Sequence, residues 1–207
     1  MSESLNRTGE EKRASILIKY RGLSVKKIQR EAEKTILYLS KNKDKMIMMC
    51  VSNQETVGVV YVRELMSLGV KEDIKKLILV GGGRYTYSAQ KMAENAENEM
   101  RNELIKTGKT KEEAQKTAKN FEIEMIPSSL PSFDIFKHRL VPKHEILSEE
   151  EKKAILEKYH AEPHQFPWIK MNDPVAIILG AKPGEIVKIT RDSQTAGTYV
   201  SYRYVIK

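Results

Sequence analysis

The chain has little cysteine and no long apolar run. Its single cysteine, Cys50, excludes a disulfide bond within the 207 residues. It stands in the apolar run 45–51, where burial raises the pKa of a thiol, so we expect a buried small side chain and not a reactive one. No apolar stretch is near the ~18 residues of a membrane-spanning helix, and the first residues lack the pattern of a secretory signal. We therefore expect an intracellular protein that has no membrane partner.

Histidine is also scarce, and its four copies lie within residues 138–164. His160 and His164 are four residues apart, a spacing that would place two metal ligands on one face of a helix. Pro163 interrupts such a helix, and no cysteine accompanies the histidines. We therefore expect hydrogen-bonding histidines and no metal site.

Two glycine-containing segments match phosphate-binding loops only in part. Residues 81–83 are three glycines after a predicted strand, but the dinucleotide-binding pattern GxGxxG would require glycine where Thr86 stands. The GKT sequence of residues 108–110 imitates the end of a P-loop, but the first glycine of that loop would fall at Glu103. The sequence therefore predicts neither a catalytic residue nor a bound cofactor.

The net charge of +8 is not concentrated in one tail. Residues 137–207 carry 12 Lys and Arg against 9 Asp and Glu, and the preceding residues carry 24 against 19. A basic balance of this size favours a position near polyanions such as nucleic acid. A solvated surface with excess lysine explains it equally well, so charge alone does not identify a partner.

The last seventy residues contain the clearest local signals. Ser148 precedes an acidic helix start, and Glu151 three residues later completes a capping box. Pro163 forbids continuation of the helix beyond it. We therefore predict a helix of about three turns that begins after Ser148.

Turns and strands follow this helix. Asp173 with Pro174 predicts a turn in which the aspartate bonds its own backbone. Residues 182–184, Lys-Pro-Gly, suit a type II turn, because the glycine can adopt the positive φ of the third position. Residues 185–191 and 198–206 have strand patterns joined by a polar connection, which is typical of an antiparallel pair. Together these signals predict a small α+β module.

These residues carry a resemblance to a known family. The strings HRLVPKHEILSEEEKKAILEKY and FPWIKMNDPVAIILGAKPGEIVKITRDSQTAGTYVSYRYV resemble the C-terminal domain of the fifth common subunit of eukaryotic RNA polymerases and its archaeal counterpart. The resemblance covers roughly a third of the chain. It implies a domain that docks on the C-terminal part of the largest polymerase subunit and helps to form the lower jaw of the cleft.

The resemblance also implies which residues form the interface or its framework. They are His138, Pro142, His144, Asp173, Pro174, Gly180, Gly184, Arg191, Thr195, Gly197, Tyr202 and Arg203. Glycine and proline usually serve backbone geometry, so an architectural role explains several of them as well as a contact does. Arg191 and Arg203 suit a contact best, because a guanidinium on a strand can bind a partner carboxylate through two hydrogen bonds.

The first 43 residues predict a helical hairpin, at residues 8–43. Thr8 starts the first helix with a capping box, and Gly22 ends it. Ser24 would cap the second helix, whose apolar residues follow helical spacing. The narrow apolar seam of this helix favours packing on the body of the protein, and a helix that binds a partner is the alternative.

Residues 45–126 predict an α/β body. Strand patterns recur at residues 46–51, 57–62, 77–80 and 121–126. The first two are close enough in sequence to form a hairpin or a pair of neighbouring strands. A short helix within residues 63–75, and a long one that is capped by Thr86 or Ser88 and ends near Thr107, separate the later strands.

Residues 127–131, with the sequence PSSLP, give the clearest linker signal in the chain. We therefore predict an N-terminal α/β domain at residues 1–131 and a C-terminal α+β assembly domain at residues 132–207. The order of segments in the first is similar to the N-terminal jaw domain of the eukaryotic subunit, which has a restriction-nuclease-like topology and no active site. Tyr87 stands where that family has proline. Residues 102–120 resemble an enlarged, charged helical hairpin, and its role stays open.

The nuclease-like topology raises an enzymatic alternative. Glu122 and Glu124 alternate on a predicted strand, as carboxylates that hold Mg²⁺ do in restriction-type nucleases. The strand lacks a lysine two residues further on, and a fold alone does not establish a function. A magnesium-dependent nuclease stays as one alternative, and a free DNA-binding protein without sequence preference as another.

The sequence therefore predicts a non-catalytic subunit of a DNA-directed RNA polymerase. Its partners would be the largest subunit, other polymerase subunits and downstream duplex DNA, the last through weak phosphate contacts. It would be cytoplasmic in an archaeon and nuclear in a eukaryote, where the polymerase it serves stays open. The lineage also stays open, because residues 180–184, GAKPG, look archaeal whereas the two-domain length looks eukaryotic or viral.

Overall fold

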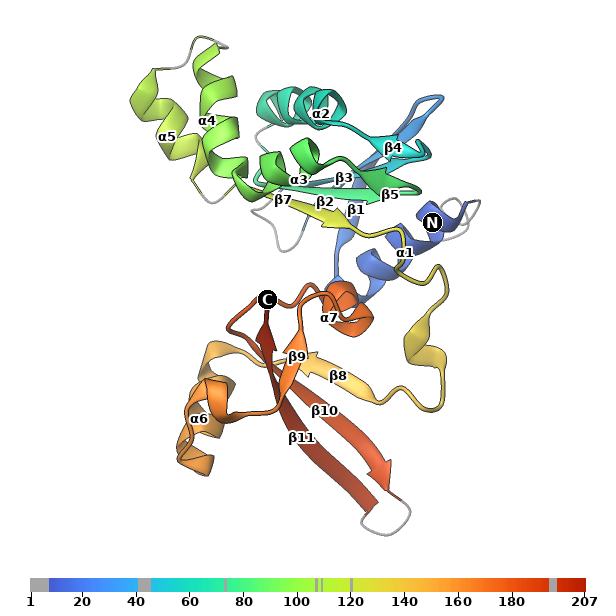
Figure 1. The fold of residues 1–207 in the computed structure, drawn as a ribbon, viewed down its shortest axis with the longest axis vertical. Coiled ribbons are helices and arrows are strands. Elements are labelled where there is room, and N and C mark those ends of the chain that lie inside the picture. The colour runs from blue at the N-terminus through green and yellow to red at the C-terminus, as the bar shows by residue number, and fades with distance from the viewer. Residues whose placement is uncertain are drawn as a thin grey trace. The chain divides into compact units, whose positions relative to one another are not determined.

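The computed structural model describes residues 8–40, 46–72, 74–106, 108, 110–119, 121–193 and 197–207. Contacts between residues divide the chain into two compact units, Met1–Ser132 and Phe133–Lys207. Both units mix α and β structure, and each is built around a sheet of its own (Figure 1). No helix within the described ranges is long and apolar enough to cross a membrane.

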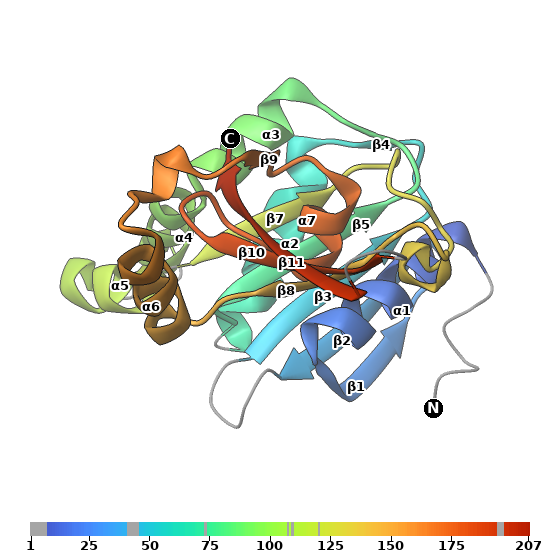
Figure 2. The same ribbon diagram turned by 90° about the horizontal axis from the view of Figure 1, so that it is seen from below.

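A five-stranded mixed sheet forms the centre of the first unit. Its strands are β1 (Ser24–Arg30), β2 (Lys34–Ser40), β3 (Met46–Ser52), β5 (Lys76–Gly81) and β7 (Glu122–Ile126). They lie side by side in this order (Figure 2). Strands β1, β2 and β3 pair antiparallel, whereas β3, β5 and β7 run parallel. Parallel neighbours need crossover connections, and helices supply both of them.

Helices cover both faces of this sheet. They are α1 (Gly9–Arg21), α2 (Val59–Lys71), α3 (Tyr87–Glu94), α4 (Ala96–Lys106) and α5 (Lys111–Ala118). Helices α2 to α5 lie on one face and α1 lies on the other (Figure 1). Successive strand residues point to opposite faces, so Met48 and Leu77 pack against α2 to α5 whereas Met49 and Ile78 point to the α1 side. All four are at most 1% exposed, so both faces are buried.

The second helix predicted within residues 24–43 is wrong, because residues 24–30 and 34–40 form strands β1 and β2. Residues 36–39 are all buried. A helix with one apolar face cannot bury four successive residues, whereas a central strand between two neighbours can. Pairing of β2 with β3 therefore overrides the helix-favouring Lys and Glu residues around it. The last part of that prediction, residues 41–43, lies outside the described residues.

The strand predicted at residues 57–62 is also wrong, and with it the hairpin to residues 46–51. Thr56–Val57 form the short strand β4, which pairs with β6 (Arg84–Tyr85) in a small parallel sheet. From Val59 the chain is helix α2. Its buried Val62, Leu65 and Met66 follow helical spacing. Packing of this face against the sheet outweighs the strand preference of the valines at the start of α2.

The predicted ends of the first helix, at Thr8 and Gly22, and the predicted start of the next helix at Thr86 are confirmed. The Thr8 hydroxyl accepts a hydrogen bond from the backbone N–H three residues later at 3.2 Å, and α1 ends at Gly22, where φ is 63°. Thr86 caps the next predicted helix. That helix is divided at Asn95 into α3 and α4, and α4 forms the predicted helical hairpin with α5.

The cysteine is buried as predicted. Cys50 is 0% exposed on β3, and its Sγ lies 3.2 Å from the Tyr61 hydroxyl oxygen. Burial raises the pKa of the thiol to about 11. The side chain is therefore protonated at neutral pH and part of the core.

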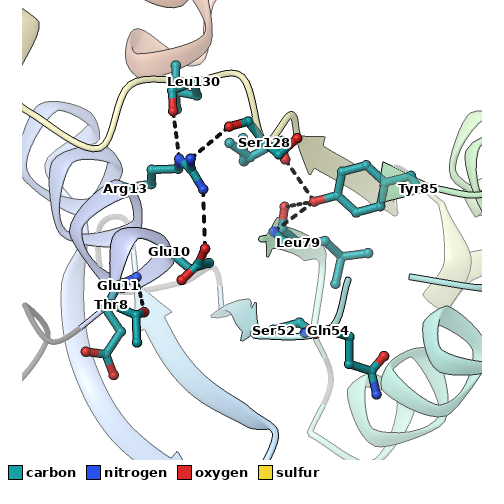
Figure 3. Close-up of polar contacts among 12 residues, drawn as sticks. Thr8, Glu10, Glu11, Arg13, Ser52, Gln54, Leu79, Tyr85, Ser128 and Leu130 are labelled. Carbon is teal, nitrogen blue, oxygen red and sulfur yellow. Dashed lines mark hydrogen bonds and ion pairs between the residues drawn. The ribbon is translucent and has the colours of Figure 1, made fainter. Parts of the chain in front are cut away.

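Residues 127–131, which predict a linker, are packed against α1. Leu130 is 2% exposed. The Arg13 guanidinium donates hydrogen bonds to the carbonyl oxygens of Leu130 at 2.7 Å and Ser128 at 2.8 Å (Figure 3). The segment therefore belongs to the first unit.

A four-stranded sheet of order β8-β10-β11-β9 forms the second unit. Its strands are β8 (Lys143–Ile146), β9 (Trp168–Lys170), β10 (Ile186–Ser193) and β11 (Gly197–Ile206). The helices are α6 (Glu149–Tyr159) and α7 (Pro174–Leu179), with the 3-10 helices η2 (Ile135–Lys137) and η3 (Pro163–Gln165). Strand β9 runs parallel to β11, and the other neighbours are antiparallel. The predicted α+β module, with its antiparallel pair β10 and β11, is confirmed.

The local signals of this unit act as predicted. Ser148 caps α6 in a complete capping box: its hydroxyl accepts from the Glu151 N–H at 3.2 Å, and its own N–H donates to the Glu151 carboxylate at 2.9 Å. The turn before β10 closes with the Glu185 N–H on the Lys182 carbonyl oxygen at 3.1 Å. Gly184 in that turn has a φ of 96°, as a type II turn requires.

Candidate docking surface

Three of the candidate residues define helix α7. The Asp173 carboxylate caps the helix, because its Oδ1 accepts a hydrogen bond from the Val175 N–H at 2.8 Å. Pro174 is the first helical residue, and Gly180 ends the helix with a φ of 74°. These residues fix where α7 begins and ends on the sheet. Their positions explain the residue types without a partner.

Gly184 joins three parts of the second unit. Its N–H donates to the Val205 carbonyl oxygen of β11 at 3.0 Å. Its own carbonyl oxygen accepts a hydrogen bond from the Lys152 ammonium of α6 at 2.8 Å. The turn therefore holds α6 against the end of the sheet.

The segment that leads into β8 carries three further candidates. His138 is exposed, and its Nδ1 accepts a hydrogen bond from the Leu140 N–H at 3.2 Å. His144 is half-buried, with its Nδ1 2.8 Å from the Pro142 carbonyl oxygen and its ring edge-on to Phe136. The expectation of hydrogen-bonding histidines fits both. No cluster of three metal-ligating side chains occurs in the described part of the chain.

Three candidates share one face of the four-stranded sheet. Strand alternation and register place His144, Arg191 and Arg203 on the face that α7 covers. Burial lowers the pKa of His144, and the two guanidiniums lower it further, whereas the Pro142 carbonyl and the Asp173 carboxylate oppose the shift. The imidazole is therefore neutral at pH 7, and positive charge dominates this face.

The two arginines differ in their own contacts. Arg203 is half-buried and donates from Nη1 to the Trp168 carbonyl oxygen of β9 at 3.2 Å. It therefore ties β9 to β11. Arg191 is exposed, and its guanidinium has no hydrogen bond or ion pair to any described residue. Of the two guanidiniums, the one of Arg191 is open to a partner.

Tyr202 points to the opposite face, where α6 lies. Its ring makes edge contacts with Tyr159 and Phe166, with ring centroids 6.0 and 6.3 Å away. Helix α6 has no fully buried side chain, so this trio of rings holds its C-terminal end to the sheet. Gly197 lies opposite Ser193 at the start of β11 with a φ of 65°. Thr195 lies outside the described residues.

Sequence reasoning missed exposed aromatic residues of this unit, among them Trp168 and Tyr199. Trp168 is 61% exposed and Tyr199 is 57% exposed. One alternating set of the strand pattern at residues 198–206 is Thr198, Val200, Tyr202, Tyr204 and Ile206, and Tyr199 belongs to the other set. The fully buried side chain of β11, Val205, lies on the other face together with Tyr199. Following both alternations of that strand would have found it.

The carboxylates that raised the nuclease alternative are engaged in ion pairs. Both oxygens of Glu124 accept hydrogen bonds from the Arg21 guanidinium, at 2.6 and 2.8 Å, and the Lys76 ammonium lies 2.8 Å away. Burial alone would raise the pKa of Glu124, but Arg21 and Lys76 lower it to about 2. Glu122 lies 3.7 Å from the same lysine. This arrangement neutralises the carboxylates within the fold.

The three glycines after β5 lie so close to other residues that a side chain would contact them. A Cβ at Gly83 would lie 1.7 Å from the Glu55 carbonyl oxygen. The Tyr85 hydroxyl accepts from the Gly81 N–H at 3.0 Å and donates toward the carbonyl oxygens of Leu79 and Ile126 (Figure 3). Burial raises the pKa of Tyr85 well above its usual value. The glycines therefore serve close packing at the ends of β5 and β7.

Comparison with known proteins matches the second unit. Residues 133–205 match the family described as RNA polymerase Rpb5, C-terminal domain. The "DNA-directed RNA polymerase subunit Rpo5" of Pyrococcus abyssi is 61% identical over 75 residues, which are 36% of this chain and 92% of that protein. The Rpo5 of Sulfurisphaera tokodaii is 52% identical over 82 residues, 40% of this chain and 98% of that protein.

The chain belongs to the Rpb5/Rpo5 family. The family match begins at residue 133, which is also the first residue of the second unit. The Rpo5 of Methanococcoides burtonii is matched over 99% of its length by 37% of this chain, at 46% identity. Such Rpo5 relatives are thus little longer than the matched region, and the first unit lies outside it.

Proposed function

We propose that this chain is a non-catalytic subunit of a DNA-directed RNA polymerase. The observation that carries the proposal is the match to Rpo5 subunits over 92–99% of their own length. The second unit would be the assembly domain, and the largest polymerase subunit its principal partner. The candidate residues agree with docking instead of chemistry, because they build caps, turns and a positively charged sheet face.

The first unit is proposed to be a jaw-like domain with a restriction-nuclease-like topology and no active site. The ion pairs of Glu124 with Arg21 and Lys76 support the absence of nuclease chemistry, because magnesium would have to displace two cations. The unit would approach downstream DNA in the lower jaw. Edge strand β1 supports such a role, since Lys26, Lys27 and Arg30 are exposed on it and it has no acidic residue.

The place of the protein in the cell follows from this assignment. A polymerase subunit works where the genome is transcribed. We propose a cytoplasmic location in an archaeal cell and a nuclear one in a eukaryotic cell.

Co-purification tests the proposal. A tagged full-length chain expressed in its own cells should retain the large polymerase subunits. Deletion of residues 133–207 should abolish this retention, whereas deletion of residues 1–132 should preserve it, because short Rpo5 relatives have little beyond the second unit. Retention of polymerase by residues 1–132 alone would contradict the proposed assembly domain. A full-length chain that captures no polymerase subunit would overturn the function.

A further inference from the structure

The β10–β11 hairpin extends beyond the rest of its sheet. Strand β8 pairs with residues 187–190 of β10, and β9 pairs with residues 204–206 of β11. Residues 191–193 and 197–199, called the hairpin arm here, pair only with each other among the described residues. Figure 1 shows the arm reaching past the other strands of the second unit. A two-stranded ribbon is only marginally stable by itself in water, so contacts of the arm with another molecule would stabilise it.

One face of the arm carries an arginine and an aromatic ring side by side. Arg191 and Tyr199 are directly opposite each other in the register, so their side chains share a face. Tyr199 is 57% exposed, and Arg191 is exposed without an ion pair to any described residue. Tyrosine and arginine are among the residues that contribute most to the binding energy of protein interfaces.

The charges on this face indicate which kind of partner it can bind. His144 and Arg203 lie on the same face of the sheet as Arg191, and Asp173 is the carboxylate that acts on His144 there. This face therefore carries two guanidiniums and one carboxylate, so its net charge is positive. The carboxylate is that of Asp173, which already caps α7. The opposite face of the arm carries Asp192, which would repel an acidic partner.

We propose that the Arg191 and Tyr199 face of the hairpin arm is the docking site for an acidic segment of another polymerase subunit. The inference rests on the proposed function and names the surface and the partner chemistry. A carboxylate of that segment would accept two hydrogen bonds from the Arg191 guanidinium. An apolar part of the segment would cover the Tyr199 ring.

Substitutions on the two faces of the arm test the site in the full-length chain. Tyr199→Ala and Arg191→Gln should each weaken binding to the polymerase lacking this subunit by about tenfold or more in a competition against wild type. Thr198→Ala, on the opposite face of the same strand, is the matched control and should bind as wild type does. Trp168 fluorescence should show that all variants keep the fold of the second unit.

Charge reversal separates an acidic partner from an apolar one. Arg191→Glu should bind more weakly than Arg191→Gln, and the difference should shrink as salt is raised. Equal binding by these two variants would overturn the acidic partner. Wild-type binding by both Tyr199→Ala and Arg191→Gln would overturn the docking site while leaving the proposed function intact. That function fails separately, if the wild-type chain itself does not bind polymerase.

Discussion

The two units of the chain differ in how completely their helices and strands are buried. In the first, Ile36 and Met48 on one face of the sheet, and Leu37 and Met49 on the other, are all 0% exposed. In the second, helix α6 has no buried side chain, and no third strand within the described part of the chain pairs with the hairpin arm. The first unit thus covers both faces of its sheet with its own helices, whereas the second leaves a helix and a hairpin open to further contacts.

The comparison with relatives shows which of the two units lies in the region that they share with this chain. Rpo5 proteins are matched over 92–99% of their length by the region that contains the less buried unit. The unit with the larger core is the part outside the match. Elements that a unit leaves partly exposed are therefore better guides to its assembly than the size of its core.

The largest expected effect is a loss of stability in the first unit that leaves the stability of the second unit unchanged. Gly83→Ala should destabilise the first unit by at least about 3 kcal/mol, because its Cβ would lie 1.7 Å from the Glu55 carbonyl oxygen. Urea unfolding followed by far-ultraviolet circular dichroism should show the early loss. The fluorescence of Trp168, the single tryptophan, reports on the second unit and should keep its midpoint.

Gly9→Ala is the matched control for this substitution. Gly9 is the first residue of α1, and a Cβ there would have its nearest neighbour at 3.9 Å. The change should stay within about 0.5 kcal/mol of wild type. A shift of the Trp168 transition by Gly83→Ala would contradict the prediction that the loss of stability is confined to the first unit.

Acid should destabilise the first unit through Glu124. Its folded pKa of about 2 is below the ordinary value of 4.5, so its stabilising contribution is complete above pH 4.5 and is lost as the pH falls toward 2. The loss amounts to about 3 kcal/mol. Glu124→Gln should remove this pH dependence and destabilise the unit at pH 7, because the buried Arg21 guanidinium would lose the negative charge of the Glu124 carboxylate.

Glu122→Gln provides the comparison on the same strand. Glu122 is 44% exposed and 3.7 Å from Lys76, and an exposed pair of this kind contributes less than about 1 kcal/mol. Urea midpoints at several pH values between 2.5 and 7 measure both variants. If Glu124→Gln unfolds with the same pH dependence as wild type, another group controls the acid sensitivity.

Local signals in the sequence predicted much of the second unit correctly. The capping box at Ser148 and the turn at Gly184 depend on neighbours within a few residues, and both form as expected. Asp173 bonds the backbone two residues on, as expected for a turn, but there it caps helix α7, which was not predicted from the sequence. The resemblance rests on the same residues. Interactions between residues close in sequence therefore allowed both the fold and the family of this unit to be predicted.

Long-range pairing limited the prediction for the first unit. Residues 34–40 become a strand because β3 lies beside them, and residues 59–71 become a helix because their apolar face meets the sheet. Neither partner can be read from the segment itself. For the same reason the ion pair of Arg21 with Glu124, 103 residues apart, could not be foreseen. The placement of Tyr199 opposite Arg191 depends on the register of β10 and β11, which only the structure supplies.

A smaller effect concerns the attachment of α6 in the second unit. Tyr159→Ala removes two edge-on ring contacts, with Phe166 and Tyr202, and should cost about 1 kcal/mol. Amide hydrogen exchange in α6 should accelerate while exchange in β10 stays slow. Lys153→Ala, at an exposed position of the same helix, is the control. Unchanged protection of α6 in Tyr159→Ala would show that the capping box and Lys152 hold the helix without the rings.

The smallest expected effect reports on the charged face of the second unit. Burial and two guanidiniums lower the pKa of His144 below its ordinary value of 6.5, so its neutral form favours the folded state and stability declines slightly as the pH falls through 6.5. Arg203→Gln should raise the pKa of His144, as measured by nuclear magnetic resonance of the ring protons. Lys188→Gln, on the opposite face of the sheet, should leave it unchanged. If both variants titrate alike, the positive charge is not confined to the face that carries Arg191 and Tyr199.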